Sequence, residues 1–272
     1  MTSFDAASKA ARLVVSELTH TFESDDGTAV PIFAGLEFSI GCSEIVSIVG
    51  RSGAGKSTLF NLISGLLPPQ SGRIAVGPRE DGTPGRIAYM LQKDLLLPWR
   101  SVIENAVLGI ELFRKVTRHD LERARQMLSR YGLGAVADAY PHALSGGMRQ
   151  RVALTRTLLV EPTLVLLDEP FSALDYETRL ALEDDVMALR QNNGTSVVLV
   201  THDIEEAIAM SDRVIILGGR PARIEQAIDI KLTVEGARTA ITAREAPEFR
   251  KWHAQIWGAL RGHTAQLGGL AA

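Results

Sequence analysis

A glycine-rich segment followed by a lysine and two hydroxyl residues is the most chemically suggestive part of the sequence. Residues 50–58 read GRSGAGKST and follow residues 45–49, an apolar run typical of a buried strand. Glycines let backbone N–H groups turn inward around an anion, and the helix expected after Gly55 adds a favourable dipole. Lys56 can reach the β- and γ-phosphates of a nucleotide, and the Ser57 hydroxyl can ligate Mg²⁺. We therefore expect a nucleotide-phosphate site formed by Gly50, Ser52, Gly53, Ala54, Gly55, Lys56, Ser57 and Thr58.

Two adjacent carboxylates end a second apolar run. Residues 163–170 read TLVLLDEP, so Asp168 and Glu169 follow a segment typical of a buried strand. Ligands of wound α/β sheets bind at the carboxyl ends of strands, so both acids are expected near the phosphate site if the two strands are neighbours. Adjacent carboxylates repel each other, which favours separate roles: Asp168 would hold Mg²⁺ through water, and Glu169 would deprotonate the attacking water. Taken alone, the pair is equally compatible with helix capping.

A histidine ends a third apolar run. Residues 197–200 are apolar and Thr201 and His202 follow them, so the His202 side chain is expected at the same edge of the sheet. An imidazole there could contact the γ-phosphate and sense whether that group is present. The alternative is a structural histidine, but the position at the end of a strand favours the functional interpretation.

The apolar runs alternate with helical patterns, which indicates a wound α/β core with a parallel sheet. The runs lie at residues 13–18, 45–49, 87–91, 164–167, 197–200 and 214–217. Helical spacing is found at residues 56–66, 120–131 and 175–190, and Asp203 with Glu206 resembles a capping box before a further helix. Two regions differ from this alternation. Residues 13–45 are expected to form short antiparallel strands around a polar loop at residues 23–27, and residues 94–155 are expected to form a helical insert.

Length and composition exclude several classes of protein. The chain has 272 residues, of which 46% are hydrophobic, and this suits one large α/β domain or two small ones. A net charge of −3 provides no broad basic field for general nucleic-acid binding. The single cysteine, Cys42, excludes a disulfide framework and a cysteine-based zinc site and fits a reducing compartment. We expect no secretory signal in the first 15 residues and no segment that spans a bilayer, because no run reaches 18 apolar residues.

The most specific segment is residues 144–151, which read LSGGMRQR. This segment resembles the signature motif of ATP-binding cassette (ABC) ATPases, and the order of the other motifs is similar to that family. They are the Walker A segment at residues 50–58, Gln92 as the Q-loop glutamine, the Walker B segment at residues 164–168 with Glu169, residues 172–175 as the D-loop, and His202 as the switch histidine. The resemblance covers about residues 12–225. It implies an α/β fold: a P-loop NTPase (RecA-like) core with an N-terminal antiparallel β subdomain and an inserted α-helical subdomain.

The resemblance implies roles for further residues, with ATP and Mg²⁺ as cofactors. Gln92 would act at the catalytic site and on the metal. Ser145 is a good helix N-cap, and Gly146 and Gly147 after it leave backbone N–H groups bare, which makes a second anion site. In the family this site faces the γ-phosphate held by a partner copy, so that two copies enclose ATP in a head-to-tail dimer, and Asp175 helps to organise the seam.

An aromatic residue near the N-terminus has two interpretations. Phe22 stands where the family has its adenine-stacking aromatic, and stacking there would contribute about 1–3 kcal/mol. The alternative is a phenylalanine buried in the core, because the loop at residues 23–27 that follows it is long and acidic.

Two short segments point to one branch of the family. Residues 92–99 (QKDLLLPW) and 101–105 (SVIEN) resemble importers that serve nitrate, sulfonate and taurine, and residues 89–94 (YMLQKD) also resemble cassettes linked to pyrimidine precursors of thiamine. The solute does not follow from this, because a periplasmic solute-binding protein and membrane subunits select it in such systems. Residues 95–99 are expected to form an apolar patch that docks a permease helix or packs into the helical insert, and the two are compatible.

Together these features predict a peripheral ATPase on the cytoplasmic face of the cell membrane. It would act as a homodimer on permease subunits that dock near residues 92–99, indirectly with a periplasmic solute-binding protein and without nucleic acid. One alternative is a soluble, non-transport cassette of translation or DNA repair, although those usually carry tandem cassettes or a long coiled coil. Another is a non-catalytic subunit, against which the intact Glu169 and His202 argue. Residues 1–235 are predicted to form a single ABC ATPase domain, and residues 236–272 a C-terminal helical appendage.

Overall fold

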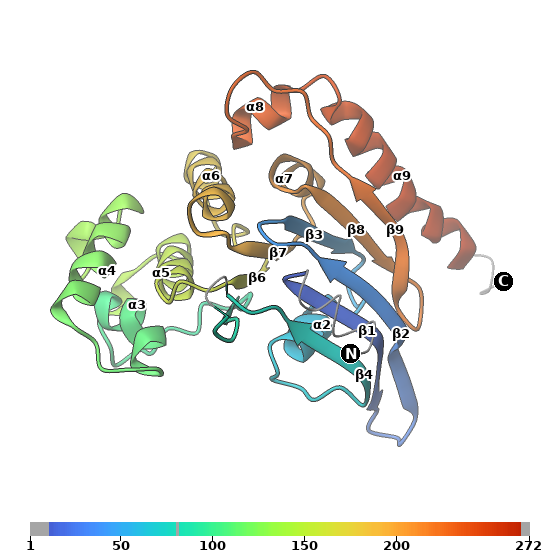
Figure 1. Cartoon of the computed structure of the whole chain (residues 1–272), viewed down its shortest axis with the longest axis horizontal. Helices are drawn as coiled ribbons and strands as arrows, with labels where there is room; N and C mark the ends of the chain where they lie inside the picture. Colours follow the sequence, from blue (N-terminus) through green and yellow to red (C-terminus); the bar gives the residue numbers. More distant parts are fainter. Residues whose placement is uncertain (1–10, 80–81, 268–272) are drawn as a thin grey trace.

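The structure, a computed structural model, describes residues 11–79 and 82–267 and contains two sheets with helices around them (Figure 1). The smaller sheet is antiparallel, in the order β2-β1-β4: β1 (Leu13–Glu23), β2 (Ala29–Ile40) and β4 (Ser71–Val76). The larger sheet has the order β5-β6-β7-β3-β8-β9. Its strands are β3 (Ile45–Gly50), β5 (Ile87–Met90), β6 (Leu164–Asp168), β7 (Ser196–Val200), β8 (Arg213–Gly218) and β9 (Arg223–Asp229). Pairing is parallel from β5 to β8, and β9 runs antiparallel to β8.

The helices fall into three groups in the chain. Three of them accompany strands of the larger sheet: α2 (Lys56–Ile63), α6 (Tyr176–Asn193) and α7 (Ile204–Met210). Three lie between β5 and β6 and form a lobe at one side of the molecule (Figure 1): α3 (Val102–Glu111), α4 (Arg118–Arg130) and α5 (Gly146–Leu158). Two follow β9: α8 (Ala240–Glu245) and α9 (Phe249–Leu267).

The central strands of the larger sheet, β3, β6, β7 and β8, are buried on both faces, which explains why they are apolar at nearly every position. Val46, Ile48 and Leu166 belong to the core shared with α2 and the smaller sheet. Leu167 and Leu199, on the opposite face, belong to the core shared with α3, α5 and α6. The predicted fold class is confirmed: the structure is an α/β fold with an antiparallel β subdomain and inserted helices.

Several strands differ from the expectation. β1 and β2 have 11 and 12 residues, where the sequence predicts short strands. Their pairing contains register shifts, and β2 begins with exposed residues that include Pro31, so the alternation that would reveal a long strand is broken. The sequence does not predict β4 and β9. β4 is at most half-buried, and β9 is a largely exposed edge strand with a charged sequence, so neither carries the apolar signal of the central strands.

The helical lobe and the chain ends allow a limited comparison with the predicted boundaries. Between β5 and β6 the described residues form helices and no strand, as expected, and α5 continues slightly past residue 155. Residues 1–10 and 268–272, which the predicted boundaries include, lie outside the described residues.

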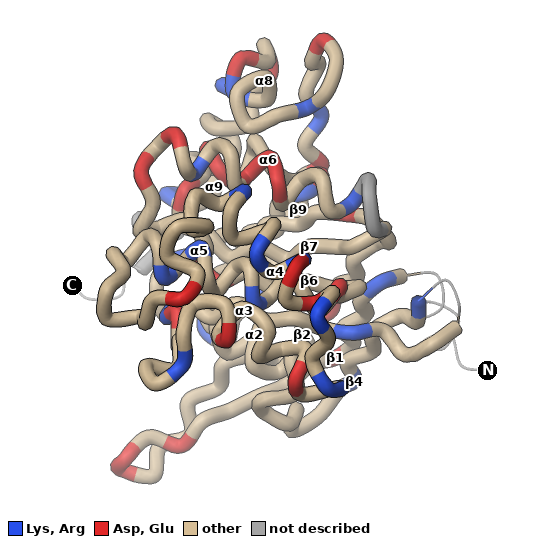
Figure 2. Tube along the Cα trace, turned by 90° about the vertical axis from the view of Figure 1, so that its left-hand side faces the viewer, with Lys and Arg blue, Asp and Glu red and all other residues tan. Residues whose placement is uncertain are grey.

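Acidic and basic residues are interspersed on the side that carries the lobe (Figure 2). In the described part of the chain, no helix is both long and apolar enough to cross a membrane.

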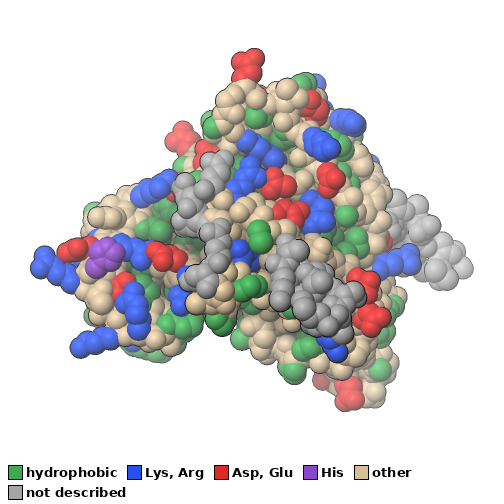
Figure 3. All heavy atoms as spheres, in the orientation of Figure 1, with side chains coloured by type: hydrophobic (Ala, Val, Ile, Leu, Met, Phe, Trp, Pro, Cys, Tyr) green, Lys and Arg blue, Asp and Glu red, His purple; other side chains and the backbone are tan. Residues whose placement is uncertain are grey.

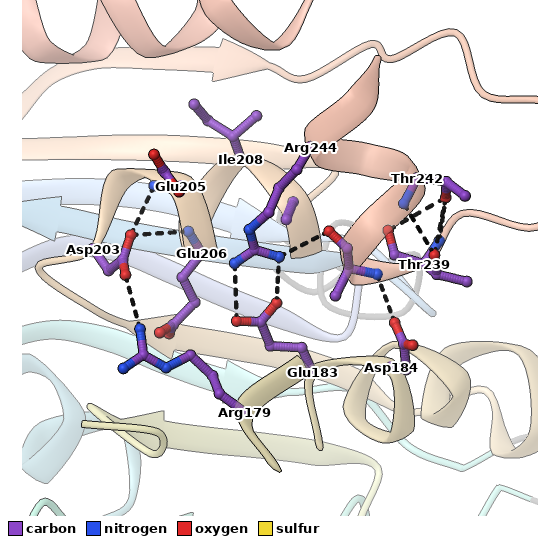
Figure 4. A network of polar contacts seen from close by, with 12 residues as sticks. Arg179, Glu183, Asp184, Asp203, Glu205, Glu206, Ile208, Thr239, Thr242 and Arg244 are labelled. Atoms are coloured by element: carbon purple, nitrogen blue, oxygen red, sulfur yellow. Dashed lines mark hydrogen bonds and ion pairs between the residues drawn. The ribbon is translucent and has the colours of Figure 1, made fainter. Parts of the chain in front are cut away.

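Charged side chains of α6, α7 and α8 gather between these helices (Figure 4). Glu206 on α7 is buried, and its Oε1 atom has no hydrogen-bond partner. Burial raises the pKa of Glu206 to about 8; the charges of Glu183 and Asp203 add to this effect, and the Thr201 hydrogen bond and the charge of Arg179 oppose it. Glu206 is therefore protonated in the folded protein near neutral pH.

This raised pKa makes the stability of the fold depend on pH. Between about pH 4.5 and pH 8 the folded state keeps a proton on Glu206 that the unfolded chain releases, so the wild-type protein should lose stability as the pH rises through this range. The Glu206→Gln variant cannot titrate at this position. The free energies of unfolding of both proteins, measured by urea denaturation near pH 5.5 and near pH 8.5, should differ increasingly in favour of the variant at the higher pH. The same difference at both pH values would contradict the assignment.

Candidate nucleotide-binding and catalytic site

The loop between β3 and α2 leaves the N-terminus of α2 without a side-chain cap. Gly53 and Gly55 have φ values of +79° and +81°, a backbone conformation that favours glycine. A Cβ atom on Gly55 would lie 2.8 Å from Ile32 and 2.9 Å from Phe33, so the loop packs directly on β2. Gly55 caps α2 without a side-chain hydrogen bond, whereas a serine, threonine or aspartate side chain caps each helix from α3 to α8. The first N–H groups of α2 are therefore available to an anion.

Lys56 lies across this loop. Its ammonium group donates hydrogen bonds to the carbonyl oxygens of Gly50, at 2.7 Å, and Arg51, at 3.0 Å. Burial lowers the pKa of Lys56, and the charges of Glu169 and Asp168 oppose this shift. The ammonium group is thus held beside the uncapped N-terminus of α2, where phosphate oxygens could replace the two carbonyl partners.

A hydroxyl and a carboxylate meet next to Lys56. The Ser57 hydroxyl donates a hydrogen bond of 2.9 Å to Asp168 Oδ2. The sequence predicts Asp168 near the loop on the condition that β3 and β6 are neighbouring strands. This condition is not met, because β7 lies between them. The two side chains still meet, because α2 begins immediately beyond the sheet edge and carries Ser57 toward the end of β6. Burial raises the pKa of Asp168, and the Ser57 hydrogen bond and the charge of Lys56 oppose this shift.

The donors at this position fit Mg²⁺. This ion prefers oxygen ligands and usually takes only one or two from a protein, the rest being water and substrate phosphates. Ser57 and Asp168 supply a hydroxyl and a carboxylate oxygen. Over the described ranges, no group of three or more metal-ligating side chains offers a complete protein cage. Tyr89 of β5, which the sequence analysis did not single out, lies next to Asp168, and its hydroxyl opposes the rise in the pKa of this carboxyl group.

Glu169 is the centre of a second group of polar side chains. Its Oε2 atom accepts a hydrogen bond of 3.0 Å from Gln92 Nε2, and its Oε1 atom lies 3.4 Å from His202 Nδ1. The three residues follow β6, β5 and β7, whose carboxyl ends share one edge of the sheet. The structure therefore brings together Gln92, Glu169 and His202 as predicted, but their catalytic roles stay predictions.

The backbone of Glu169 has a conformation that the surrounding chain must hold in place. Its φ value is +50°, which costs free energy for a residue with a side chain. The Glu169 N–H donates to the Val200 carbonyl at 2.8 Å, and the Glu169 carbonyl accepts hydrogen bonds of 3.1 Å from Gln150 Nε2 and from the Ser172 hydroxyl. These bonds fix the direction in which the carboxylate points.

Three consecutive residues of α5 tie the signature segment to the rest of the chain. Arg149 Nε lies 3.0 Å from Asp94 Oδ2, in the segment that follows Gln92. Gln150 is buried and bonds to the Glu169 carbonyl and to the N–H of Ala173. Arg151 bonds to the Tyr131 carbonyl at 2.6 Å. The sequence shows residues 149–151 as the polar end of the signature segment. It does not show their role, because their partners lie far apart in the chain.

The structure keeps the signature segment apart from the Walker A loop. Ser145 caps α5 through a hydrogen bond of 3.2 Å from the Met148 N–H. A Cβ atom on Gly147 would lie 3.0 Å from the Ala173 carbonyl, so this glycine is also needed for close packing on the D-loop. Gly146 is exposed and faces open space, apart from the end of the Arg149 side chain. Among the residues that the structure describes, no hydrogen bond or ion pair joins Ser145 or Gly146 to residues 50–58.

Two further predicted residues lie on the surface. Asp175 caps α6 by accepting the Thr178 N–H at 2.9 Å, and this bond lowers the pKa of Asp175. Phe22, at the end of β1, is 41% exposed, so the alternative of a core phenylalanine is wrong. It pairs with Val30, near the residues of β2 that contact Gly55, and its ring packs edge-to-face on His20 with 4.8 Å between centroids. Both predicted roles remain untested.

Comparison with known proteins identifies the family. The family profile described as "ABC transporter" matches residues 33–172. The chain is 43% identical over 227 residues to the aliphatic sulfonates import ATP-binding protein SsuB 2 of Agrobacterium fabrum, covering 81% of this chain and 80% of that one. It is 42% identical over 248 residues to the uncharacterized ABC transporter ATP-binding protein YtlC of Bacillus subtilis, covering 90% and 94%. Relatives with 36–40% identity are named for the import of nitrate, formylaminopyrimidine and taurine.

A solved structure shows the same fold. The ATP-binding cassette MJ0796, described as a dimer in a post-hydrolysis state bound to ADP and Pi, aligns with a TM-score of 0.71 and 28% identity, over 80% of this chain and 99% of that one. The chain therefore belongs to the ABC transporter family. Its activity is that of the family's ATP-binding cassettes: it is an ATPase that uses ATP with Mg²⁺. The resemblance inferred from the motifs is confirmed.

The position of Lys56 makes a direct prediction about nucleotide affinity. Lys56→Ala removes a charge-assisted contact to phosphate, which is worth about 1.5–3 kcal/mol. Affinity for ATP should fall about tenfold or more, measured by equilibrium titration with a fluorescent ATP analogue. Lys115→Ala, at an exposed lysine before α4, is the matched control and should bind ATP as the wild type does. Unchanged affinity in Lys56→Ala would count against the phosphate site.

Proposed function

We propose that this chain is the energy-coupling subunit of an importer for a small organic or anionic solute. The observation that most directly supports this proposal is the position of Glu169 between Gln92 and His202, beside the pair formed by Ser57 and Asp168. Relatives named for the import of sulfonates, nitrate and taurine support the importer class. The solute is a nitrate-like, sulfonate-like, taurine-like or pyrimidine-precursor compound.

In the proposed reaction each group has one task. The N–H groups at the start of α2 and the Lys56 ammonium bind and orient the phosphates of ATP. Bound Mg²⁺ neutralises phosphate charge, and Ser57, Asp168 and Gln92 would hold it. Glu169 takes a proton from the attacking water through its carboxylate, whose direction Gln92 and His202 restrain. In this role His202 would also contact the γ-phosphate and respond to its loss.

The functional unit is a homodimer. Among the described residues of one chain, no hydrogen bond or ion pair joins Ser145 or Gly146 to the phosphate loop, so this second anion site would need a partner copy to act on the same nucleotide. Two copies packed head to tail would place each signature segment on the γ-phosphate held by the other, with Asp175 at the seam. The dimeric cassette MJ0796 supports this arrangement.

The permease subunits would dock on the apolar residues beside Gln92. Both expectations for residues 95–99 fit the side chains: Leu96 is buried in the core with α3, whereas Leu95 and Trp99 are 54% and 71% exposed. Figure 3 shows hydrophobic side chains along the lower margin of the lobe that carries α3–α5. Arg156 holds this segment through the Asp94 and Leu95 carbonyls, at 2.6 and 2.9 Å. Movement of the docked permease would thus reach α5 and Glu169, and the chain would sit peripherally on the cytoplasmic face of the membrane.

Removal of the general base should separate binding from turnover. Glu169→Gln keeps the hydrogen bonds of the side chain but cannot accept the proton, so phosphate release should fall by about 10²–10⁴-fold. ATP binding should persist, and the variant should accumulate as a dimer in size-exclusion chromatography with ATP. Glu122→Gln, at an exposed glutamate of α4, should behave as the wild type. Near-normal turnover in Glu169→Gln would remove Glu169 from this role.

The docking surface can be tested with the tagged full-length chain, purified from its native cells in mild detergent. We expect a polytopic membrane protein to co-purify with the wild type and to be lost with Trp99→Ala, because the exposed indole would be the main apolar contact. Trp257→Ala, at a half-exposed tryptophan of α9, is the control and should retain the partner. Recovery of ribosomes or nucleic acid in place of a membrane protein would favour the non-transport alternative.

A further inference from the structure

The segment after β9 holds α7 by its carboxyl end. Arg238 donates hydrogen bonds to the carbonyl oxygens of Ala209, Ile208 and Ser211, at 3.0, 2.8 and 2.8 Å. Helix carbonyls at a C-terminus have no partner within the helix, and a guanidinium group there also matches the helix dipole. α7 has only seven residues, so this cap supports much of its length.

The same segment reaches the buried charges next to the other end of α7 (Figure 4). Arg244 on α8 forms a two-pronged ion pair with Glu183 on α6, at 2.7 and 3.0 Å. The Glu183 side chain is fully buried, so its charge depends on this partner. Glu206 of α7 belongs to the same group, since its pKa responds to Glu183. Ala240, at the start of α8, also bonds through its N–H to Asp184 on α6, at 2.6 Å.

Asp203, which caps the N-terminus of α7, directly follows His202 in the chain. Asp203 caps α7 by accepting the N–H groups of Glu205 and Glu206, at 2.9 and 3.2 Å. Asp203 also pairs with Arg179 on α6, at 3.3 Å. The His202 side chain is 69% exposed, so its place beside Glu169 depends on the backbone that leads into α7 and not on packing around the ring.

Apolar contacts make the same connection. Ile204 and Ile208 of α7 share one core with Ala243, Phe249 and Ile256, which belong to α8 and α9. The segment after β9 therefore completes the hydrophobic environment of α7 as well as pairing its charges. Two independent kinds of contact, ionic and apolar, hold the helix that follows His202.

We propose that Arg238 and Arg244 of the C-terminal segment are positioning residues for His202. They hold α7 so that the imidazole stays within reach of Glu169 and of the γ-phosphate position. This inference rests on the proposed function, because it assumes that His202 acts in ATP hydrolysis. It makes the C-terminal segment part of the ATPase machinery, in contrast to an appendage that could be removed without loss of turnover.

The test is steady-state ATPase kinetics of the full-length chain in two variants. The Arg244→Gln variant leaves Glu183 buried without its partner, so a second variant, Arg244→Gln with Glu183→Gln, removes both charges and protects the fold. The double variant should show a melting temperature close to that of the wild type, a KM for ATP within about twofold, and a kcat lowered about tenfold or more, because misplacement of an active-site group by about 1 Å costs this much or more. Arg250→Gln, at an exposed arginine of α9, is the control.

The outcomes separate this inference from the function on which it rests. A lower kcat with unchanged KM in the folded double variant supports positioning of His202. A wild-type kcat in that variant overturns it, and so does a parallel loss of kcat, ATP affinity and melting temperature, which would show only a structural role. A wild-type chain without ATPase activity would overturn the proposed function itself, and the inference with it.

Discussion

The site depends on one constraint, the parallel pairing of β5, β6, β7 and β3, which ends four strands at one edge of the sheet. Gln92, Asp168 with Glu169, His202 and the Walker A loop each follow one of these strands. Their chemistry needs contacts of about 3 Å between residues that are far apart in the chain, such as Gln92 with Glu169, 77 positions apart, and Ser57 with Asp168, 111 positions apart. A shift in the register of β6 would separate the hydroxyl, the carboxylate and Glu169 at once.

The sequence reveals this site because these strands are largely buried and each is followed within two residues by its polar residue. An uninterrupted apolar run then shows both the strand and the position of the side chain after it. The same reasoning fails at the margins of the fold. β9 is exposed and charged, and β2 carries register shifts and Pro31, so neither shows a regular pattern. The sequence could place Asp168 near the loop only on the condition that β3 and β6 are neighbours, because strand order comes from packing and not from local pattern.

Supporting residues are harder to predict than reacting ones. Gln150 and Tyr89 have no distinctive spacing, yet Gln150 bonds to the backbone carbonyl of Glu169, and Tyr89 lies beside Asp168 and affects its pKa. In the sequence, nothing distinguishes Arg238 and Arg244 from other arginines. In the fold, Arg238 bonds to the C-terminal end of α7, and Arg244 pairs with Glu183. Such residues act through other side chains, and their partners become visible only in three dimensions. The proposed catalytic arrangement is therefore more readily inferred than the contacts that keep it in place.

The central claim is that one chain carries two half-sites, the Walker A loop and the signature segment, which are completed only by a second copy. Mixing two variants that should each lose ATPase activity alone, Lys56→Ala and Gly146→Asp, tests it most directly. Gly146 faces largely open space, so the aspartate should be tolerated by the fold while repelling phosphate. The account predicts that the mixture recovers ATPase activity, because a mixed dimer pairs one intact phosphate loop with one intact signature segment. A mixture as inactive as its components, although mixed dimers form, would contradict it.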